Sequence, residues 1–284
     1  MIDRYAVIGN PVAHSRSPEI HAAFARATGQ QLSYEKLLAP LDAFATTIEA
    51  FAVAGGKGVN VTVPFKVEAL GLARDLTERA TVAGAVNTLR RDADRWFGDN
   101  TDGAGLVRDL CDNRGVTLTD REVLVLGAGG AVRGILGPLL ATSPRILVVA
   151  NRTAAKARAL ATQFASHGSI VATDTEELAG RSFDVIINGT SASLGTADDA
   201  AWPSVGFAAD GVGYDLVYGS SSSVFQSWAK AQGAARVHDG LGMLIEQAAE
   251  SFWFWRGIRP DTGPLLALFG ASRECRSRTV VKRP

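Results

Sequence analysis

One glycine-rich stretch constrains this chain more than any other feature. Residues 123–126 have the apolar composition of a buried strand, and Gly127-Ala128-Gly129-Gly130-Ala131 follow them directly. Apolar residues then recur at helical spacing from Val132 onward. A strand, a glycine turn and a helix bring a helix N-terminus against a pyrophosphate, because glycine lets the backbone approach the phosphates closely. The stretch therefore predicts a dinucleotide site. Val132 stands where a third Gly or Ala is usual, and a tight loop without a ligand is the alternative.

The next apolar run indicates which dinucleotide the site would accept. Residues 146–150 again resemble a buried strand, and Asn151-Arg152-Thr153 follow them. An NAD-binding chain places an acidic residue here, about 20 residues after the glycines. This chain instead has Arg152, with Lys156 one helical turn further on. A guanidinium binds a 2′-phosphate through charge-assisted hydrogen bonds, so the sequence predicts NADP rather than NAD. The alternative is that Thr153 caps a helix and the basic residues are merely solvated.

Composition excludes several other classes of protein. Lys and Arg together number 29, as do Asp and Glu, so the formal net charge of zero argues against nucleic-acid binding. No apolar run is long enough to span a membrane, and residues 5–8 resemble a first strand rather than a signal peptide. The two cysteines and four histidines lack metal-ligand spacing, so we predict no metal site. We expect a cytoplasmic protein that binds small molecules.

The order of predicted elements divides the chain into two parts. From residue 123 to about residue 237, apolar strands alternate with helical segments, which is typical of a doubly wound parallel sheet. The part before it is also α/β, with residues 85–89 and 95–98 expected to pair as a hairpin, but it has no pyrophosphate loop. A cofactor part beside a part with polar strand ends predicts that substrate binds in the cleft between them.

Polar residues gather in short segments near strand ends of the first part. They are Ser15-Arg16-Ser17, residues 60–66, Asn87-Thr88 and Asn100-Thr101-Asp102. Hydroxyls and amides with few charges suit a small molecule with several hydroxyl groups, and two serines beside a helix N-terminus suit a carboxylate. The alternatives are structural: Ser17 and Asp102 as helix caps, and Asn60 and Asn87 as partners of loop backbone.

Lys66 is the least expected of these polar residues. We predict a helix that begins around Phe65, and a cation in its first turn faces the positive end of the helix dipole, which is unfavourable. Such a lysine needs a functional reason. A lysine near an aspartate, here Asp102, is a workable proton-transfer pair.

Together these segments resemble the shikimate dehydrogenases from residue 5 to about residue 269. The similarity rests on His14-Ser15-Arg16-Ser17-Pro18, Asn60-Val61-Thr62-Val63-Pro64-Phe65-Lys66, Gly84-Ala85-Val86-Asn87-Thr88 and Gly98-Asp99-Asn100-Thr101-Asp102-Gly103. The glycine loop, Asn151-Arg152-Thr153, Tyr214-Asp215-Leu216-Val217-Tyr218 and Gly240-Leu241-Gly242-Met243-Leu244 with Gln247 belong to the same pattern. The resemblance implies reversible, NADP-dependent reduction of 3-dehydroshikimate to shikimate, a step of aromatic amino acid and chorismate biosynthesis.

The resemblance also implies roles for individual residues. Lys66 and Asp102 would be the catalytic pair, and Ser15 and Ser17 would hold the substrate carboxylate. The other substrate contacts would be Asn60, Thr62, Asn87, Tyr218 and Gln247. The cofactor contacts would be Glu78, Gly127, Ala128, Gly129, Gly130, Ala131, Asn151, Arg152, Thr153, Lys156, Thr190, Leu216 and Gly240.

The family fold implies a discontinuous first domain. Residues 1–103 would form the substrate-binding α/β domain, completed by C-terminal helices at 241–270, and residues 104–240 would form an NADP-binding Rossmann domain. A flexible basic tail would follow at 271–284, and the protein would be a monomer or a homodimer. The chain departs from the family at Lys156, where Arg is frequent, and at Gly189, where Ala is usual.

Several other functions remain open on the sequence. A quinate/shikimate or aminoshikimate dehydrogenase of the same superfamily would share these residues. A methylene-tetrahydrofolate dehydrogenase shares the broad layout, but the serines and asparagines do not suggest a folate pocket. A non-enzymatic NADP(H) sensor would not need Lys66 and Asp102.

Overall fold

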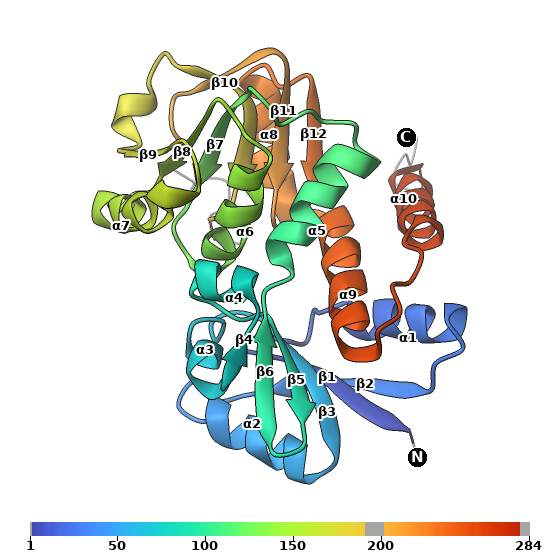
Figure 1. Ribbon diagram of the computed structural model, residues 1–284. Helices are drawn as coiled ribbons and strands as arrows, with labels where there is room; N and C mark the ends of the chain where they lie inside the picture. The colour runs from blue at the N-terminus through green and yellow to red at the C-terminus, as the bar shows by residue number, and fades with distance from the viewer. Residues whose placement is uncertain (1, 191–201, 279–284) are drawn as a thin grey trace.

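The computed structural model describes residues 2–190 and 202–278, which form two six-stranded sheets with their covering helices (Figure 1). The strands are β1 (Asp3–Gly9), β2 (Leu32–Leu38), β3 (Gly56–Val61), β4 (Asp75–Leu76), β5 (Thr88–Asp92), β6 (Arg95–Asp99), β7 (Glu122–Leu126), β8 (Ile146–Ala150), β9 (Ile170–Thr173), β10 (Ser182–Asn188), β11 (Gly206–Asp215) and β12 (Arg236–Asp239). The α-helices are α1 (Ser17–Ala27), α2 (Phe44–Val53), α3 (Glu68–Leu72), α4 (Glu78–Ala83), α5 (Asp102–Arg108), α6 (Gly130–Ala141), α7 (Ala154–Phe164), α8 (Ser223–Ala231), α9 (Leu241–Arg256) and α10 (Gly263–Arg278).

The first sheet has the order β2-β1-β3-β5-β6-β4. Its β1, β2 and β3 are parallel, β5 runs in the opposite direction, and β6 pairs with β5 in the predicted hairpin. Phe44, Ile48 and Phe51 of α2 are buried in one cluster with apolar side chains of β1 and β3. On the other face the ring of Tyr5 stacks on Trp255 of α9, with 4.6 Å between centroids. The carboxyl ends of β1, β3 and β6 and the amino end of β5 share one edge of this sheet.

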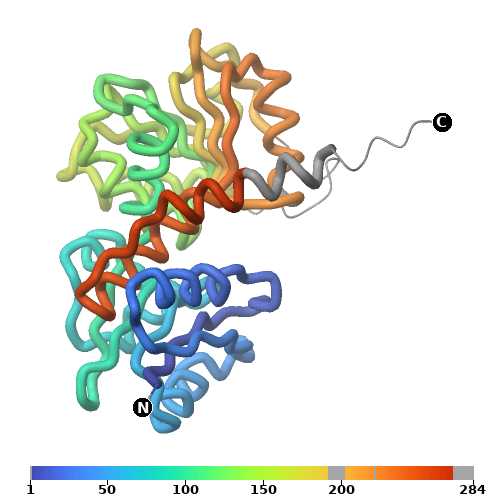
Figure 2. The backbone as a smooth tube through the Cα atoms, turned by 90° about the vertical axis from the view of Figure 1, so that its right-hand side faces the viewer, coloured from blue at the N-terminus to red at the C-terminus, as the bar shows by residue number. Residues whose placement is uncertain are grey.

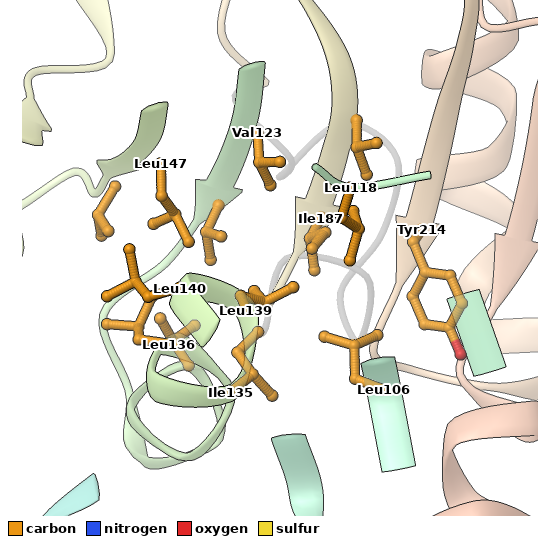
Figure 3. Close-up of a cluster of buried hydrophobic side chains, with 14 of the residues drawn as sticks. Leu106, Leu118, Val123, Ile135, Leu136, Leu139, Leu140, Leu147, Ile187 and Tyr214 are labelled. Carbon is orange, nitrogen blue, oxygen red and sulfur yellow. The ribbon is translucent and has the colours of Figure 1, made fainter. Parts of the chain in front are cut away.

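The second sheet has the order β12-β11-β10-β7-β8-β9, and each neighbouring pair is parallel. This order confirms the predicted doubly wound sheet of the Rossmann type. Its central strands are buried on both faces, as their unbroken apolar runs predicted. Figure 3 shows one face, where Leu136, Leu139 and Leu140 of α6 gather with Val123 of β7 and Leu147 of β8. This packing holds the start of α6, and the glycine loop before it, at the carboxyl edge of the sheet.

Helices α9 and α10 return from the second sheet to the first part of the chain. Figure 2 shows these red segments at the junction of the two parts. Ile245 and Phe252 of α9 and Leu265 of α10 form a buried cluster with Ile20 and Phe24 of α1. The chain crosses between the sheets for the first time through α5, which packs along α9. Of the predicted flexible tail, residues 271–278 belong to α10, and residues 279–284 lie outside the described residues.

A buried histidine lies between the first sheet and α9. His21 is fully buried, its ring stacks on Tyr34 with 4.3 Å between centroids, and neither ring nitrogen makes a regular hydrogen bond to a described residue. Burial lowers the pKa of His21 from 6.5 to about 3, while the nearby Asn60 side chain has a weaker, opposite effect. The folded protein therefore keeps this imidazole neutral in mild acid.

We expect His21 to make the protein less stable as the pH falls. The unfolded chain protonates this histidine near pH 6.5 and the folded protein only near pH 3, so the unfolded state binds more protons between these values. The free energy of unfolding should then decrease by about 2 kcal/mol between pH 7.5 and pH 5 through this group alone. Urea unfolding should show that extra loss in the wild type and not in His21→Phe, which keeps a stacked ring. The exposed His167 supplies the control, since His167→Gln should lose stability like the wild type. An equal pH dependence of the wild type and His21→Phe would contradict this prediction.

Candidate active site

A cavity of about 780 Å³ lies where the carboxyl edges of the two sheets face each other, and residues of both parts line it. All nine predicted substrate residues line this cavity, although they come from distant parts of the chain. They are Ser15, Ser17, Asn60, Thr62, Lys66, Asn87, Asp102, Tyr218 and Gln247. The fold thus brings together a set that local sequence could only suggest.

Lys66 and Asp102 form an ion pair in this cavity. Lys66 Nζ lies 2.6 Å from Asp102 Oδ2, and the two side chains are only 12% and 6% exposed. Asn87 Nδ2 donates to the other carboxylate oxygen of Asp102 at 2.8 Å. An amine held beside a buried carboxylate in a cavity wall can give a proton to a bound molecule in its ammonium form, or take one from it in its neutral form.

The predicted helix start around Phe65, with Lys66 in the first turn, is wrong. Residues 63–67 form turns, and α3 begins at Glu68, two residues after Lys66, and has five residues. The backbone oxygen of Lys66 accepts a hydrogen bond from Val86 N at 2.8 Å, which ties the turn to the segment before β5. The position of Lys66 therefore depends on this loop contact and on Asp102, and not on a helix dipole.

The predicted N-cap role of Ser17 is also wrong. Helix α1 begins at Ser17 itself, Arg16 is the capping position, and no side chain caps the helix. Ser15 Oγ accepts from Ser17 N at 3.3 Å and lies 3.2 Å from Ser17 Oγ. The two hydroxyls lie side by side on the cavity wall, where both can donate to one anionic group. The same holds for Asp102, which is the first residue of α5 and makes no capping bond.

The amides on this wall have different surroundings. Asn87 precedes β5 instead of following a strand, and it reaches the same edge because β5 is antiparallel to its neighbours. Asn60 lies near the end of β3, where its side-chain oxygen accepts from Tyr34 Oη at 2.7 Å. Across the cavity, burial raises the pKa of Tyr218, with a weaker opposing effect of the Arg16 backbone, so its hydroxyl keeps a proton to donate.

The glycine loop forms the opposite wall. Gly127 has φ +110°, and a Cβ there would come within 2.9 Å of the Gly189 carbonyl oxygen, so the turn requires glycine. A Cβ on Gly129 would meet no described atom within 4 Å, because this residue faces the open cavity. The loop precedes α6, whose N-terminus therefore points into the space where a pyrophosphate would bind.

Most predicted cofactor residues line the same wall. Besides the loop itself, they include Asn151, Arg152, Thr190, Leu216 and Gly240. Arg152 follows β8, is exposed, and makes no ion pair with any residue in 2–190 or 202–278, so its guanidinium is available to a ligand. Glu78, Thr153 and Lys156 do not line the cavity: Glu78 begins α4, Thr153 precedes α7, and Lys156 is exposed on α7.

The described residues hold no group of three or more His, Cys, Asp or Glu side chains suited to a metal ion. Over the same residues, no helix has the length and apolar character needed to cross a membrane.

Comparison with known proteins agrees with this geometry. The model for the shikimate dehydrogenase substrate binding domain matches residues 7–89, that for shikimate/quinate 5-dehydrogenase matches residues 109–200, and that for the shikimate 5′-dehydrogenase C-terminal domain matches residues 240–267. The chain belongs to the shikimate dehydrogenase family.

Individual relatives share most of the chain. The shikimate dehydrogenase (NADP(+)) of Nitrosospira multiformis is 56% identical over 96% of this chain and 98% of its own, and that of Aromatoleum aromaticum is 57% identical over 94% and 96%. Among solved structures, the Ael1 enzyme from Pseudomonas putida has a TM-score of 0.84, with 46% identity over 94% of this chain and 97% of its own. The Thermus thermophilus shikimate 5-dehydrogenase in complex with NADP(H) and shikimate has a TM-score of 0.77, with 34% identity over 92% and 96%.

Two departures noted in the sequence meet in the glycine-loop wall. Val132 of α6 stands where the general dinucleotide motif has a third Gly or Ala, and Gly189 stands after β10, where the family resemblance leads us to expect Ala. A Cβ on Gly189 would lie 2.4 Å from Val132 Cγ2. The side chain that is extra at one position therefore fills the space left by the missing methyl group at the other.

Other residues of the site had no signal in the sequence. Thr175, Trp202 and Pro203 line the cavity on the cofactor side, and no motif marked them. Arg16, between the two serines, places its guanidinium 4.0 Å from the ring centroid of Phe269 on α10. This contact links the serine loop to the C-terminal helix, and only a three-dimensional structure could reveal it.

Proposed function

We propose that this shikimate dehydrogenase family member catalyses the reversible, NADP-dependent reduction of 3-dehydroshikimate to shikimate. One observation carries the proposal: the Lys66–Asp102 ion pair lies in a cavity that two serine hydroxyls and the pyrophosphate-type glycine loop also line. The curated relatives named shikimate dehydrogenase (NADP(+)) support the same activity. The reaction belongs to the synthesis of aromatic amino acids.

Lys66 would transfer the proton. As the substrate carbonyl becomes an alcohol, its oxygen gains negative charge and must receive a proton, and Lys66 Nζ is the cationic donor in the cavity that can supply it. In the oxidative direction the same amine would accept the proton. Asp102 would orient the amine and bind the neighbouring hydroxyl, while Thr62, Asn87, Tyr218 and Gln247 would bind the remaining ring oxygens.

The residues of the opposite wall fit NADP. The open glycine loop and the start of α6 would hold the pyrophosphate, and Arg152 would bind the 2′-phosphate through its guanidinium. When bound, the cofactor supplies the hydride. Glu78, Thr153 and Lys156 stay predictions, because they lie outside the cavity as the structure has it.

The predicted domain boundaries, oligomeric state and cellular location are also part of the proposal. Residues 1–103 with 241–270 would be the substrate-binding domain, and residues 104–240 the cofactor-binding domain. All proposed contacts come from one chain, so a monomer suffices and a homodimer would contain two sites. We propose a cytoplasmic location, because Cys111 forms no disulfide with any residue whose side chain the structure describes, as is usual in a reducing compartment.

Enzymes of this fold act on other substrates too, so the assay must distinguish between several possible activities. A 5-ketofructose reductase of a Gluconobacter strain has a TM-score of 0.77 with 27% identity, so the fold alone does not select shikimate. The decisive experiment mixes the protein with shikimate and NADP+ and follows absorbance of NADPH. Quinate with NADP+, and shikimate with NAD+, are parallel arms. Faster turnover of quinate would favour the quinate alternative, and binding of NADP(H) without turnover of either acid would favour a sensor.

Removing one serine hydroxyl should weaken substrate binding specifically. Hydrogen bonds to charged groups contribute about 1.5–3 kcal/mol, so Ser15→Ala should raise the KM for shikimate by about tenfold or more. The KM for NADP+ should stay at the wild-type value, which serves as the internal control. Steady-state kinetics with both substrates varied checks this result. If the methyl ester of shikimate were oxidised as well as the free acid, the serines would not be binding a carboxylate.

A further inference from the structure

A set of buried polar side chains lies directly behind the catalytic pair. Tyr34 of β2, Asn60 of β3, Thr88 of β5 and Asn87 before it are joined by hydrogen bonds that end at Asp102. Thr88 is fully buried and Asn60 and Asn87 are nearly so. Thr88 belongs to one of the polar segments noted in the sequence, but the family resemblance implied no individual role for it. Buried polar groups need partners, so the direction of each hydrogen bond can be worked out.

The surroundings of Asn87 fix the orientation of its amide. The carboxylate of Asp102 can only accept, so the atom 2.8 Å from Asp102 Oδ1 is the amide nitrogen. The backbone N–H of Thr101 can only donate, and it lies 2.8 Å from the other amide atom, which is therefore the oxygen. A flipped amide would place two acceptors together at Asp102 and two donors together at Thr101.

This orientation determines the next two links. Asn87 Oδ1 is an acceptor, so Thr88 is the donor in their 2.9 Å hydrogen bond, and the Ser251 hydroxyl, 2.8 Å from Thr88 Oγ1, can then act only as a donor to Thr88. With that proton committed, Thr88 Oγ1 can only accept from Asn60, at 3.0 Å, so the Asn60 nitrogen faces Thr88. The Asn60 oxygen then faces Tyr34 Oη at 2.7 Å. Burial raises the pKa of Tyr34 well above its usual value, so the phenol keeps the proton that it donates here.

We propose that Thr88 is a positioning residue for the catalytic pair, because it is the central link of a one-way hydrogen-bond chain from Tyr34 through Asn60, Thr88 and Asn87 to Asp102. Every donor in the chain points toward the carboxylate. Hydrogen bonds in such a chain polarise one another, so a break at Thr88 weakens the hold on Asn87 and, through it, on Asp102. The inference rests on the proposed function, since its readout is shikimate oxidation.

Ser251 joins this chain to α9. Its hydroxyl accepts from Asn60 Nδ2 at 2.9 Å, and its single proton can go to Thr88 Oγ1 at 2.8 Å or to the Gln247 backbone oxygen at 3.0 Å. Gln247 lines the cavity one helical turn earlier. Thr88 therefore joins β5 of the first sheet to the helix that carries another substrate contact, and it is not itself among the residues that line the cavity.

Thr88→Val tests the proposal, because valine keeps the shape and the strand propensity of threonine but cannot donate a hydrogen bond. We expect kcat for shikimate oxidation to fall about tenfold and the KM for shikimate to rise, while the KM for NADP+ stays unchanged. Thr88→Ser restores the hydroxyl and should return both values toward the wild type. The control is Thr47→Val on α2. It removes a hydroxyl that donates to the Ala43 backbone oxygen and takes no part in the hydrogen-bond chain behind Asp102, so kcat and both KM values should stay unchanged.

A merely structural role would give a different result. Thr88→Val would then lower the melting temperature but leave kcat and both KM values of the folded enzyme as in the wild type, which would overturn the proposal. If Thr88→Val does not fold, Tyr34→Phe cuts the chain at its far end and should lower kcat in the same direction by a smaller factor; unchanged kinetics would overturn the proposal equally. A wild-type protein that does not oxidise shikimate would contradict the proposed function instead.

Discussion

Lys66→Ala should lower kcat for shikimate oxidation by about 10²- to 10⁴-fold, the usual contribution of a general acid–base group. Its amine is the proton donor and acceptor that we propose for the substrate oxygen, and it lies 2.6 Å from the Asp102 carboxylate inside the cavity. An interaction made mainly in the transition state affects kcat more than KM, so the KM for shikimate should change little. Steady-state kinetics across the pH range, with shikimate and NADP+ varied in turn, measures both.

The loss of Lys66 also removes the partner of a buried carboxylate, which is destabilising in its own right. Thermal unfolding of the variant therefore accompanies the kinetics, and activity is expressed per folded protein. Lys57→Ala, at an exposed position of β3, is the matched control and should keep the wild-type kcat. Asp102→Asn should lower kcat too but disturb the KM for shikimate more, because Asp102 is proposed to touch the substrate. A near-normal kcat of Lys66→Ala at every pH would mean that another group supplies the proton.

Arg152→Ala should remove most of the preference for NADP+ over NAD+. Two charge-assisted hydrogen bonds to the 2′-phosphate would favour NADP+ by about 10²-fold or more in kcat/KM. Among residues 2–190 and 202–278, Arg152 has no ion-pair partner that would hold it away from a ligand. The measurement compares kcat/KM for both cofactors in the wild type and in the variant, at one ionic strength because the interaction is partly screened.

The control for this prediction is Arg158→Ala, another exposed arginine of the same region. Arg158 lies on α7, pairs with Asp174 at 3.3 Å and does not line the cavity, so its loss should leave the cofactor preference unchanged. Equal use of NAD+ and NADP+ by the wild type would contradict the assignment of Arg152. If Arg152→Ala kept the preference for NADP+, the role of binding the 2′-phosphate would pass to Lys156, which lies on α7 as Arg158 does.

The fold could be predicted where periodicity and strand endings carried the information. The apolar runs of β7 and β8, the first followed by glycines and the second by Asn151 and Arg152, predicted the second sheet and its cofactor edge. Helix starts were less accurate. The serine, proline and acidic residue at the start of α1 suggested a cap at Ser17, but Ser15 accepts the first hydrogen bond instead. A loop contact with Val86, invisible in local sequence, likewise delays α3 beyond Lys66.

The site could be predicted only in part, for a similar reason. Segment by segment, the polar residues indicated a carboxylate and several hydroxyl groups, and the family resemblance supplied the roles. No local pattern could connect Thr88 with Ser251, which lie 163 positions apart in the chain. Hydrogen-bond direction depends on all neighbours of an atom, so the chain behind Asp102 becomes apparent only once the fold has brought its members together.

The packing of Val132 against Gly189 restricts the order in which substitutions at these two positions can occur. Val132 lies in a helix, where a β-branched side chain has one strongly preferred rotamer, so it cannot turn away from a new methyl group 2.4 Å distant. Restoring the usual alanine at Gly189 first would force a clash between α6 and the segment after β10. Shortening Val132 first would leave only a small void, which proteins tolerate more readily. A small residue at 132 together with alanine at 189 is therefore accessible from this sequence by one route and blocked by the other.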